Sequence, residues 1–121
     1  FMKKKLVKLN DSEIKTLISR LDGWSYEDGK ISKTFNTLNW RTTLMVTSMI
    51  SYLCEVAWHH PKLIIEFNTV IVNLWTHEIN GVSERDFEVA MKIDQIVTWD
   101  PSKNPDGALT GLPKNDRMFE K

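Results

Sequence analysis

The sequence predicts an α+β domain in which helices cover one face of a four-stranded antiparallel sheet. Three segments carry apolar residues at helical spacing, and the two pairs of short apolar runs between them have the length and composition of strands. Each pair is divided by a turn sequence, as in a β-hairpin. The expected element order is therefore α-β-β-α-β-β-α, within a chain of 121 residues, a length typical of one domain.

The first helix is expected over about residues 11–21, with residues 10–12 available as N-caps and Asp22-Gly23 as a stop. Two strands should follow, at residues 24–26 and 31–35, because residues 27–30 between them contain an Asp-Gly turn. The apolar residues of this helix follow the i, i+3, i+4, i+7 rule: Ile14, Leu17, Ile18 and Leu21.

The second helix has the clearest periodicity and is expected from about Asn39 to Trp58. Pro61 disfavours the α conformation at His60, so the helix should end at the histidine pair. A second hairpin is expected beyond it, with strands at residues 63–67 and 70–75. The helical repeat consists of Val46, Met49, Ile50, Leu53, Cys54 and Ala57.

The last helix is expected to begin at Ser83, after a turn at Asn80-Gly81. Beyond Trp99 the tail has three prolines, two glycines and little periodicity. We therefore expect an N-terminal extension over residues 1–9, a domain over residues 10–98 and an irregular C-terminal extension over residues 99–121. The expected core positions of the last helix are Phe87, Ala90, Met91, Ile93 or Asp94, and Val97.

Composition narrows the functional classes. Sixteen basic and sixteen acidic residues give a formal charge of zero, which argues against direct nucleic-acid binding. No apolar stretch reaches the length of a membrane span and no signal peptide is visible, so we expect a cytoplasmic protein with no membrane partner. The single cysteine, Cys54, lies in an apolar helical run and should be a core residue in a reducing compartment.

The three histidines lie close together in the sequence, at positions 59, 60 and 77. Glu55 and His59 are spaced i and i+4 and should be neighbours on one helix face. The negative end of the helix dipole favours an imidazolium there, and an imidazolium can act as a general acid. His77 falls at the end of the second hairpin, on the strand face that Trp75 shares.

Structural roles are also open to these residues. A histidine at a helix end can be a simple C-cap, and Ser83-x-x-Asp86 has the spacing of a capping box, so Asp86 can serve helix donors alone. Arg85 would by default be a solvated charge. A metal site has little support, because adjacent histidines rarely ligate one ion and neither a His-x-x-x-His motif nor a Cys pair occurs. Tryptophans 24, 58 and 75 can be core, interface or stacking surfaces.

Three motifs follow one another in the sequence: Glu55-x-x-x-His59-His60-Pro61, then Phe67-Asn68-x-Val70, then Thr76-His77-Glu78-x-x-Gly81-Val82-Ser83-Glu84-Arg85-Asp86. Taken together, they closely resemble the pterin-4a-carbinolamine dehydratase family. The resemblance extends upstream to Gly23-Trp24 and Ile31-x-x-x-Phe35, so that it covers about residues 10–98.

The resemblance implies a lyase that dehydrates 4a-hydroxytetrahydropterin to quinonoid dihydropterin in tetrahydrobiopterin recycling, with neither cofactor nor metal. It implies homodimers or homotetramers with sheets joined across the dimer. His59 and His77 would handle the two protons and His60 would hold the pterin. By matching position, the resemblance implies catalytic residues His59, His60, His77 and Asp86, and substrate-binding residues Glu55, Trp24, Thr76 and Arg85.

Some positions depart from the family pattern. Lys62-Leu63 replaces an acidic residue and a tryptophan, and Trp58 stands where the animal enzyme has an acidic residue. The tail after Trp99 has no counterpart in the short animal forms and could cover the pocket or extend an oligomer contact. The alternative function is a non-catalytic interaction module, a dimerisation cofactor of a transcription regulator, against which the intact histidine set argues.

Overall fold

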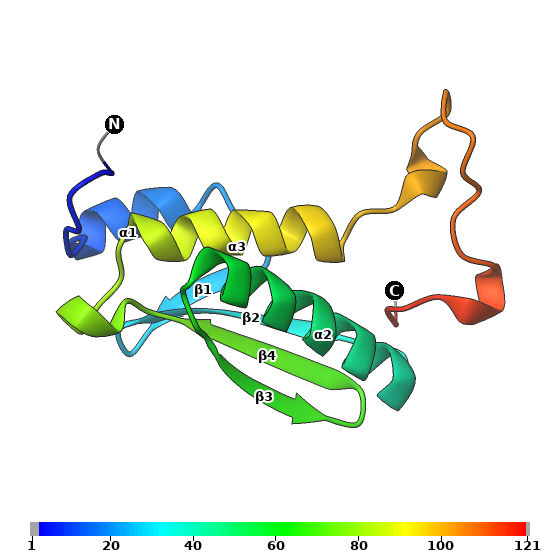
Figure 1. Cartoon of the computed structure of the whole chain (residues 1–121), viewed down its shortest axis with the longest axis horizontal. Helices are drawn as coiled ribbons and strands as arrows, with labels where there is room; N and C mark the ends of the chain where they lie inside the picture. The colour runs from blue at the N-terminus through cyan, green and yellow to red at the C-terminus, as the bar shows by residue number, and fades with distance from the viewer. Residues whose placement is uncertain (1–2, 121) are drawn as a thin grey trace.

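The structure, a computed structural model, describes residues 3–120 and confirms the predicted α+β class and element order (Figure 1). Its sheet has the strand order β1-β2-β4-β3, and all neighbouring strands are antiparallel. The main elements are α1 (Asp11–Ile18), β1 (Trp24–Glu27), β2 (Lys30–Asn36), α2 (Trp40–Ala57), β3 (Lys62–Glu66), β4 (Thr69–Leu74) and α3 (Glu84–Val97).

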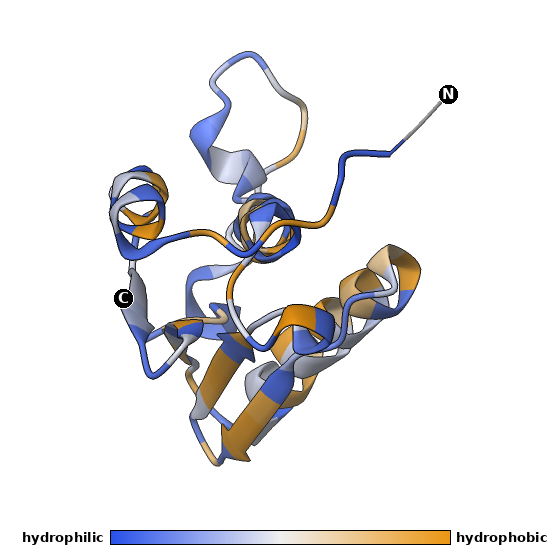
Figure 2. Ribbon diagram, turned by 90° about the vertical axis from the view of Figure 1, so that its left-hand side faces the viewer, coloured by the Kyte–Doolittle hydropathy of each residue, from blue (hydrophilic) through white to orange (hydrophobic). Residues whose placement is uncertain are grey.

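The helices lie on one side of the sheet, as the two perpendicular views show (Figures 1 and 2). Side chains alternate across a strand, so every second residue of β2 and β4 faces the helices. These residues form the core together with apolar side chains of α2 and α3. The buried apolar residues on this face of the two central strands are Ile31, Phe35, Val70, Val72 and Leu74, each at most 4% exposed.

α1, α2 and α3 each begin with the reciprocal hydrogen bonds of a capping box. The pairs are Asn10 with Glu13, Asn39 with Thr42, and Ser83 with Asp86. α1 ends at Ile18 rather than near residue 21, because the N–H groups of Arg20 and Leu21 bond to carbonyls three residues back, which tightens the last turn.

α2 ends in a Schellman motif centred on Trp58. The Trp58 N–H donates to the Glu55 carbonyl and the His59 N–H donates to the Cys54 carbonyl, at 3.1 and 3.0 Å. Trp58 takes the left-handed conformation that this motif requires, with φ 53° and ψ 46°. The helix therefore ends at Ala57, four positions before Pro61, and the direction of both histidines is set by this turn.

One expected core position proves wrong, because Met91 of α3 is 50% exposed. Ala57, the last residue of the apolar repeat in α2, is exposed as well. α3 packs against α2 and is bonded to the sheet through Asp94, and in this position Val89 is buried whereas Met91 is exposed. Within residues 3–120, no helix combines the length and apolarity needed to cross a membrane.

The C-terminal segment, residues 99–120, leaves α3 and returns to the end of β2 (Figure 1). It contains two short 3-10 helices, η2 (Pro101–Lys103) and η3 (Lys114–Asp116). Met118 accepts the Leu38 N–H at 3.0 Å, and the Phe119 ring lies 6.3 Å from that of Phe35. Antiparallel pairing places Asn36 opposite Thr69 and Ile31 opposite Leu74, so the tail meets the sheet at the end remote from His77.

Candidate functional site

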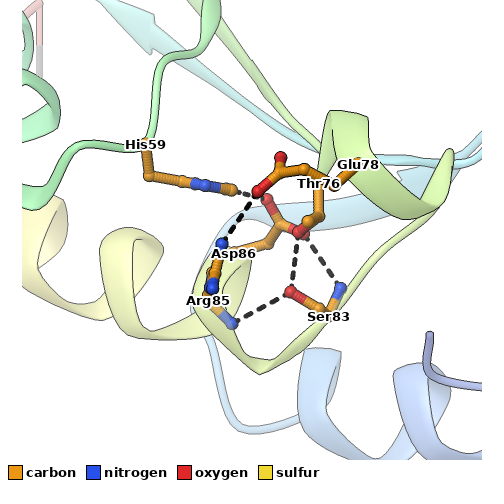
Figure 3. Close-up of polar contacts among 6 residues, drawn as sticks. All are labelled: His59, Thr76, Glu78, Ser83, Arg85 and Asp86. Carbon is orange, nitrogen blue, oxygen red and sulfur yellow. Dashed lines mark hydrogen bonds and ion pairs between the residues drawn. The ribbon is translucent and has the colours of Figure 1, made fainter. Parts of the chain in front are cut away.

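Two of the buried predicted site residues, His59 and Asp86, meet between the end of α2 and the first turn of α3 (Figure 3). His59 Nε2 lies 2.6 Å from Asp86 Oδ1, and the two residues are 7% and 0% exposed. Because a carboxylate only accepts, the proton of the imidazole resides on Nε2. The other ring nitrogen, Nδ1, is left to exchange a proton with a ligand.

A chain of hydrogen bonds converges on the second oxygen of Asp86. Thr76 Oγ1 donates to Oδ2 at 2.8 Å and the Ser83 N–H donates at 3.0 Å. The Ser83 hydroxyl lies 2.6 Å from Thr76 Oγ1, and it accepts the N–H of Arg85. Three donors surround the Asp86 carboxyl at the positive end of the α3 dipole, and hydrogen bonds of this kind fix its position. The predicted capping role of Asp86 and its partnership with histidine therefore coexist.

His60 points away from this pair. Its Nε2 lies 2.9 Å from Glu55 Oε1, and both side chains are at least half exposed. The i, i+4 spacing had predicted Glu55 beside His59 instead. That expectation is wrong because the left-handed Trp58 reverses the chain after α2, which turns His59 inward and brings His60 back over the last helical turn.

His77 lies not on β4 itself but in the 3-10 helix η1 (His77–Ile79), which follows the strand. Its exposed ring stacks on Trp75, with centroids 4.4 Å apart and planes inclined by 16°. Lys30 Nζ lies 4.9 Å from the centre of the same indole. The turn closes where Thr76 and Gly81 form a bridge. His77 is thereby presented to solvent next to Thr76, which bonds to Asp86.

Arg85 and Glu78 form an exposed ion pair beside His59, with Nη1 and Oε2 3.0 Å apart (Figure 3). The pKa of Glu78 is lowered, first by a hydrogen bond from its own backbone N–H and then by the positive charge of Arg85, with a smaller contribution from His59. Arg85 is therefore not a free surface cation. Glu78 was present in the third sequence motif but had no assigned role.

Trp24 lies outside this cluster. It is buried, and its Nε1–H donates to Asp94 Oδ2 at 3.0 Å, while Lys33 binds the other oxygen of Asp94 at 2.9 Å. Asp94 stands eight positions after Asp86, about 12 Å along α3 at the usual rise per residue. Trp24 thus fixes α3 against β1, and no hydrogen bond joins it to a histidine.

Ser83 and Trp75 belong to this cluster but are not among the site residues predicted from the sequence, where Trp75 is only a possible stacking surface. The sequence predicts Ser83 as an N-cap, and its capping-box spacing is the signal that it would contact Asp86. Trp75 stands two positions before His77, on the same strand face, which was the signal for the observed stacking.

Two further features of residues 3–120 bear on ligand binding. No three His, Cys, Asp or Glu side chains are grouped so that they could hold a metal ion. A cavity of about 1220 Å³ lies between the C-terminal segment, β2 and the end of α3, and Phe35, Trp99 and Phe119 are among its lining residues. None of the predicted site residues lines this cavity.

Known proteins resemble the chain in both sequence and structure. The family model described as Pterin 4 alpha carbinolamine dehydratase matches residues 7–96. Proteins of Aquifex aeolicus and Sulfolobus acidocaldarius, each named "Putative pterin-4-alpha-carbinolamine dehydratase", are 43% and 39% identical over 90 residues. Those alignments cover 74% of this chain and 91% and 99% of the relatives. A crystal structure described as transcriptional coactivator/pterin dehydratase from Brucella melitensis has a TM-score of 0.70 at 32% identity, covering 75% of this chain and 99% of that one.

Proposed function

Because the chain belongs to the pterin 4 alpha carbinolamine dehydratase family, we propose that it removes water from 4a-hydroxytetrahydropterin and releases quinonoid dihydropterin. We assign this activity to residues 10–98 and place it in the recycling of tetrahydrobiopterin. The observation that carries the proposal is the buried His59–Asp86 pair, since a carboxylate that binds one imidazole nitrogen and leaves the other available is the arrangement that orients a histidine for proton transfer.

The reaction requires two proton transfers. The bond from C4a to its hydroxyl oxygen breaks, the N5–H proton leaves, and a double bond forms between N5 and C4a. One group protonates the departing hydroxyl, so that water leaves, and a second group accepts the N5 proton. The lone pair on N5 expels the hydroxyl, so the proposal requires no cofactor and no metal.

His59 and His77 together supply the acid and the base. Asp86 holds His59 through Nε2 and stabilises its positive charge, so Nδ1 can lose a proton to the substrate or gain one from it. His77 is fixed by stacking on Trp75 while its ring remains exposed. After one turnover the two imidazoles have exchanged protonation states, and solvent restores them.

Other residues of the site bind or position the substrate. His60, oriented by Glu55, would hold the pterin by a hydrogen bond. Thr76 donates to the Asp86 carboxylate, and the backbone N–H of Arg85 donates to the Ser83 hydroxyl in the same hydrogen-bond chain. We assign both residues to the substrate-binding side of the site. Trp24 supports the site from a distance, because it holds α3 through Asp94.

We also propose that the protein acts as a homodimer or homotetramer. β3 is an edge strand of the sheet, and edge strands with free backbone groups readily pair with a second copy. Ile64 and Ile65 on β3 are 38% and 37% exposed, and Phe67 beyond it is 63% exposed. Sedimentation of the purified protein would test this state.

The activity can be tested by generating 4a-hydroxytetrahydropterin with an aromatic amino acid hydroxylase and measuring its dehydration. We expect the wild-type chain to accelerate the spontaneous reaction and His59→Ala to lose about 10²–10⁴ in kcat. His60→Ala is the matched control, because loss of a substrate contact should raise KM and leave kcat nearly unchanged. Dehydration at the spontaneous rate with the wild-type chain would refute the enzyme proposal.

A second candidate is a non-catalytic interaction module. The observation in its favour is a row of exposed apolar side chains along α2, formed by Leu44, Tyr52 and Val56, which are 44%, 68% and 69% exposed. The Brucella relative is described as a transcriptional coactivator as well as a dehydratase. Tyr52→Glu would disrupt binding through this row and leave the histidine site intact.

A further inference from the structure

Trp58 combines two features that disfavour a large side chain. It holds the left-handed position of the Schellman motif, with φ 53°, where glycine or asparagine is usual because a β-carbon is crowded there. Its side chain is also 75% exposed, the highest value among the exposed large hydrophobic residues of the described chain. An indole at this position stabilises neither the backbone conformation nor the hydrophobic core.

The ring contact that the structure shows for Trp58 is with His60. The two centroids are 5.0 Å apart and the ring planes are inclined by 80°. His60 is in turn bonded through Nε2 to Glu55. The imidazole plane is therefore steeply inclined to the indole, and its Nδ1, the nitrogen that is not bonded to Glu55, can form a hydrogen bond with a ligand that stacks on the indole.

We propose that Trp58 is a substrate-contacting residue which stacks on the flat bicyclic ring of the pterin and sets the affinity for it. This inference rests on the proposed function. Strained residues concentrate where their conformation serves binding or catalysis, and Trp58 directly precedes His59. A pterin ring resembles a nucleobase in size and polarity, and nucleobases stack favourably on tryptophan.

The competing occupant of the indole surface is a second copy of the chain. Tyr52 and Val56, which precede Trp58 on α2, are also exposed. If Trp58 lay in such an interface, its removal would shift the oligomeric state or lower the melting temperature. If it binds the pterin, its removal would leave assembly unchanged and would relieve the backbone strain.

The decisive comparison is between Trp58→Asn and Trp58→Phe. Asparagine suits the left-handed position, so we expect Trp58→Asn to melt about 3–6 °C higher and to show a KM raised about 5-fold to 100-fold, with kcat little changed. Trp58→Phe keeps a stacking ring and should hold KM within about threefold. Trp99→Asn is the control, since Trp99 is another exposed tryptophan, at 66%, outside the site.

An unchanged KM in Trp58→Asn would overturn the inference, as would a lower melting temperature or a smaller assembly on sedimentation. Equilibrium binding of 7,8-dihydrobiopterin separates this failure from failure of the enzyme proposal. A wild-type chain that binds this probe through Trp58 but does not accelerate dehydration would refute the activity and support the contact. A wild-type chain that is active, with Trp58→Asn binding the probe equally well, would refute the contact alone.

Discussion

His59 at the end of α2 donates a 2.6 Å hydrogen bond to Asp86 in the first turn of α3, so one carboxylate both caps a helix and orients an imidazole. The pairing joins two helices that pack against each other. Because Asp86 is fully buried and receives three hydrogen bonds, its side chain is held in one rotamer. The geometry of the proposed acid–base group is therefore set by the helix cap.

Asp86→Asn should show how much catalysis depends on this carboxylate. An amide of the same size places a donor against either His59 or the donors of Thr76 and Ser83, so the imidazole loses its orientation and its counter-charge. We expect kcat to fall about 10²–10⁴ and the pH–rate profile to change. Glu84→Gln, an exposed acidic residue in the same helical turn, is the control. A normal kcat with an unaltered pH–rate profile would contradict the role given to Asp86.

His77→Ala should separate catalysis from stability. The His77 ring is exposed and stacks on only one face of Trp75, so its loss should change the free energy of unfolding by less than about 1 kcal/mol. If His77 transfers a proton, kcat should fall about 10²–10⁴. Lys30→Ala removes the cation above the same indole and should leave kcat unchanged. Equal kcat in wild type and His77→Ala would remove His77 from the proton-transfer pair.

The Cys54 thiol should be unreactive in the folded protein. Burial raises its pKa from 9.0 to about 11, so the nucleophilic thiolate is scarce at pH 8. Ellman's reagent should react with it only after unfolding in guanidinium. The unfolded thiol ionises at a lower pH than the folded one, so the free energy of unfolding should fall as pH rises from 9 to 11, by about 1 kcal/mol per unit relative to Cys54→Ala. Rapid labelling of the native protein would contradict this assignment.

Phe119→Ala should weaken the fold without affecting the proposed reaction. Phe119 packs against the core and its ring meets that of Phe35, so we expect a loss of about 1–3 kcal/mol in the free energy of unfolding. The contact lies at the Asn36 end of β2, about 17 Å along the strand from the Ile31 end that neighbours the histidines. The dehydratase kcat/KM should therefore stay within about twofold of wild type, as in Leu109→Ala, a control in the exposed part of the tail. A large loss of kcat/KM would show that the tail does reach the site.

The element order was predictable because each element carries a local signal. Period-2 alternation set which residues of β4 face the core, and Ser83-x-x-Asp86 set the start of α3. Errors occurred where packing against a second partner decided burial, as at Met91, which periodicity alone had placed in the core. The site was also predictable only in part. The sequence identified His59 and Asp86 as candidates, but spacing paired Glu55 with His59, whereas the structure pairs it with His60.

By itself, the sequence determined the elements, their capping residues and the family, because these depend on side chains close together in the chain or on motifs at fixed spacing. Only the tertiary structure decided that His59 turns inward to Asp86 while His60 turns outward to Glu55. The directions of the two histidines depend on the left-handed backbone conformation of Trp58, which an L-residue with a bulky side chain rarely adopts. The tertiary structure also decided that Trp24 binds Asp94 and that the tail returns to the far end of β2, because both contacts join residues distant in the chain.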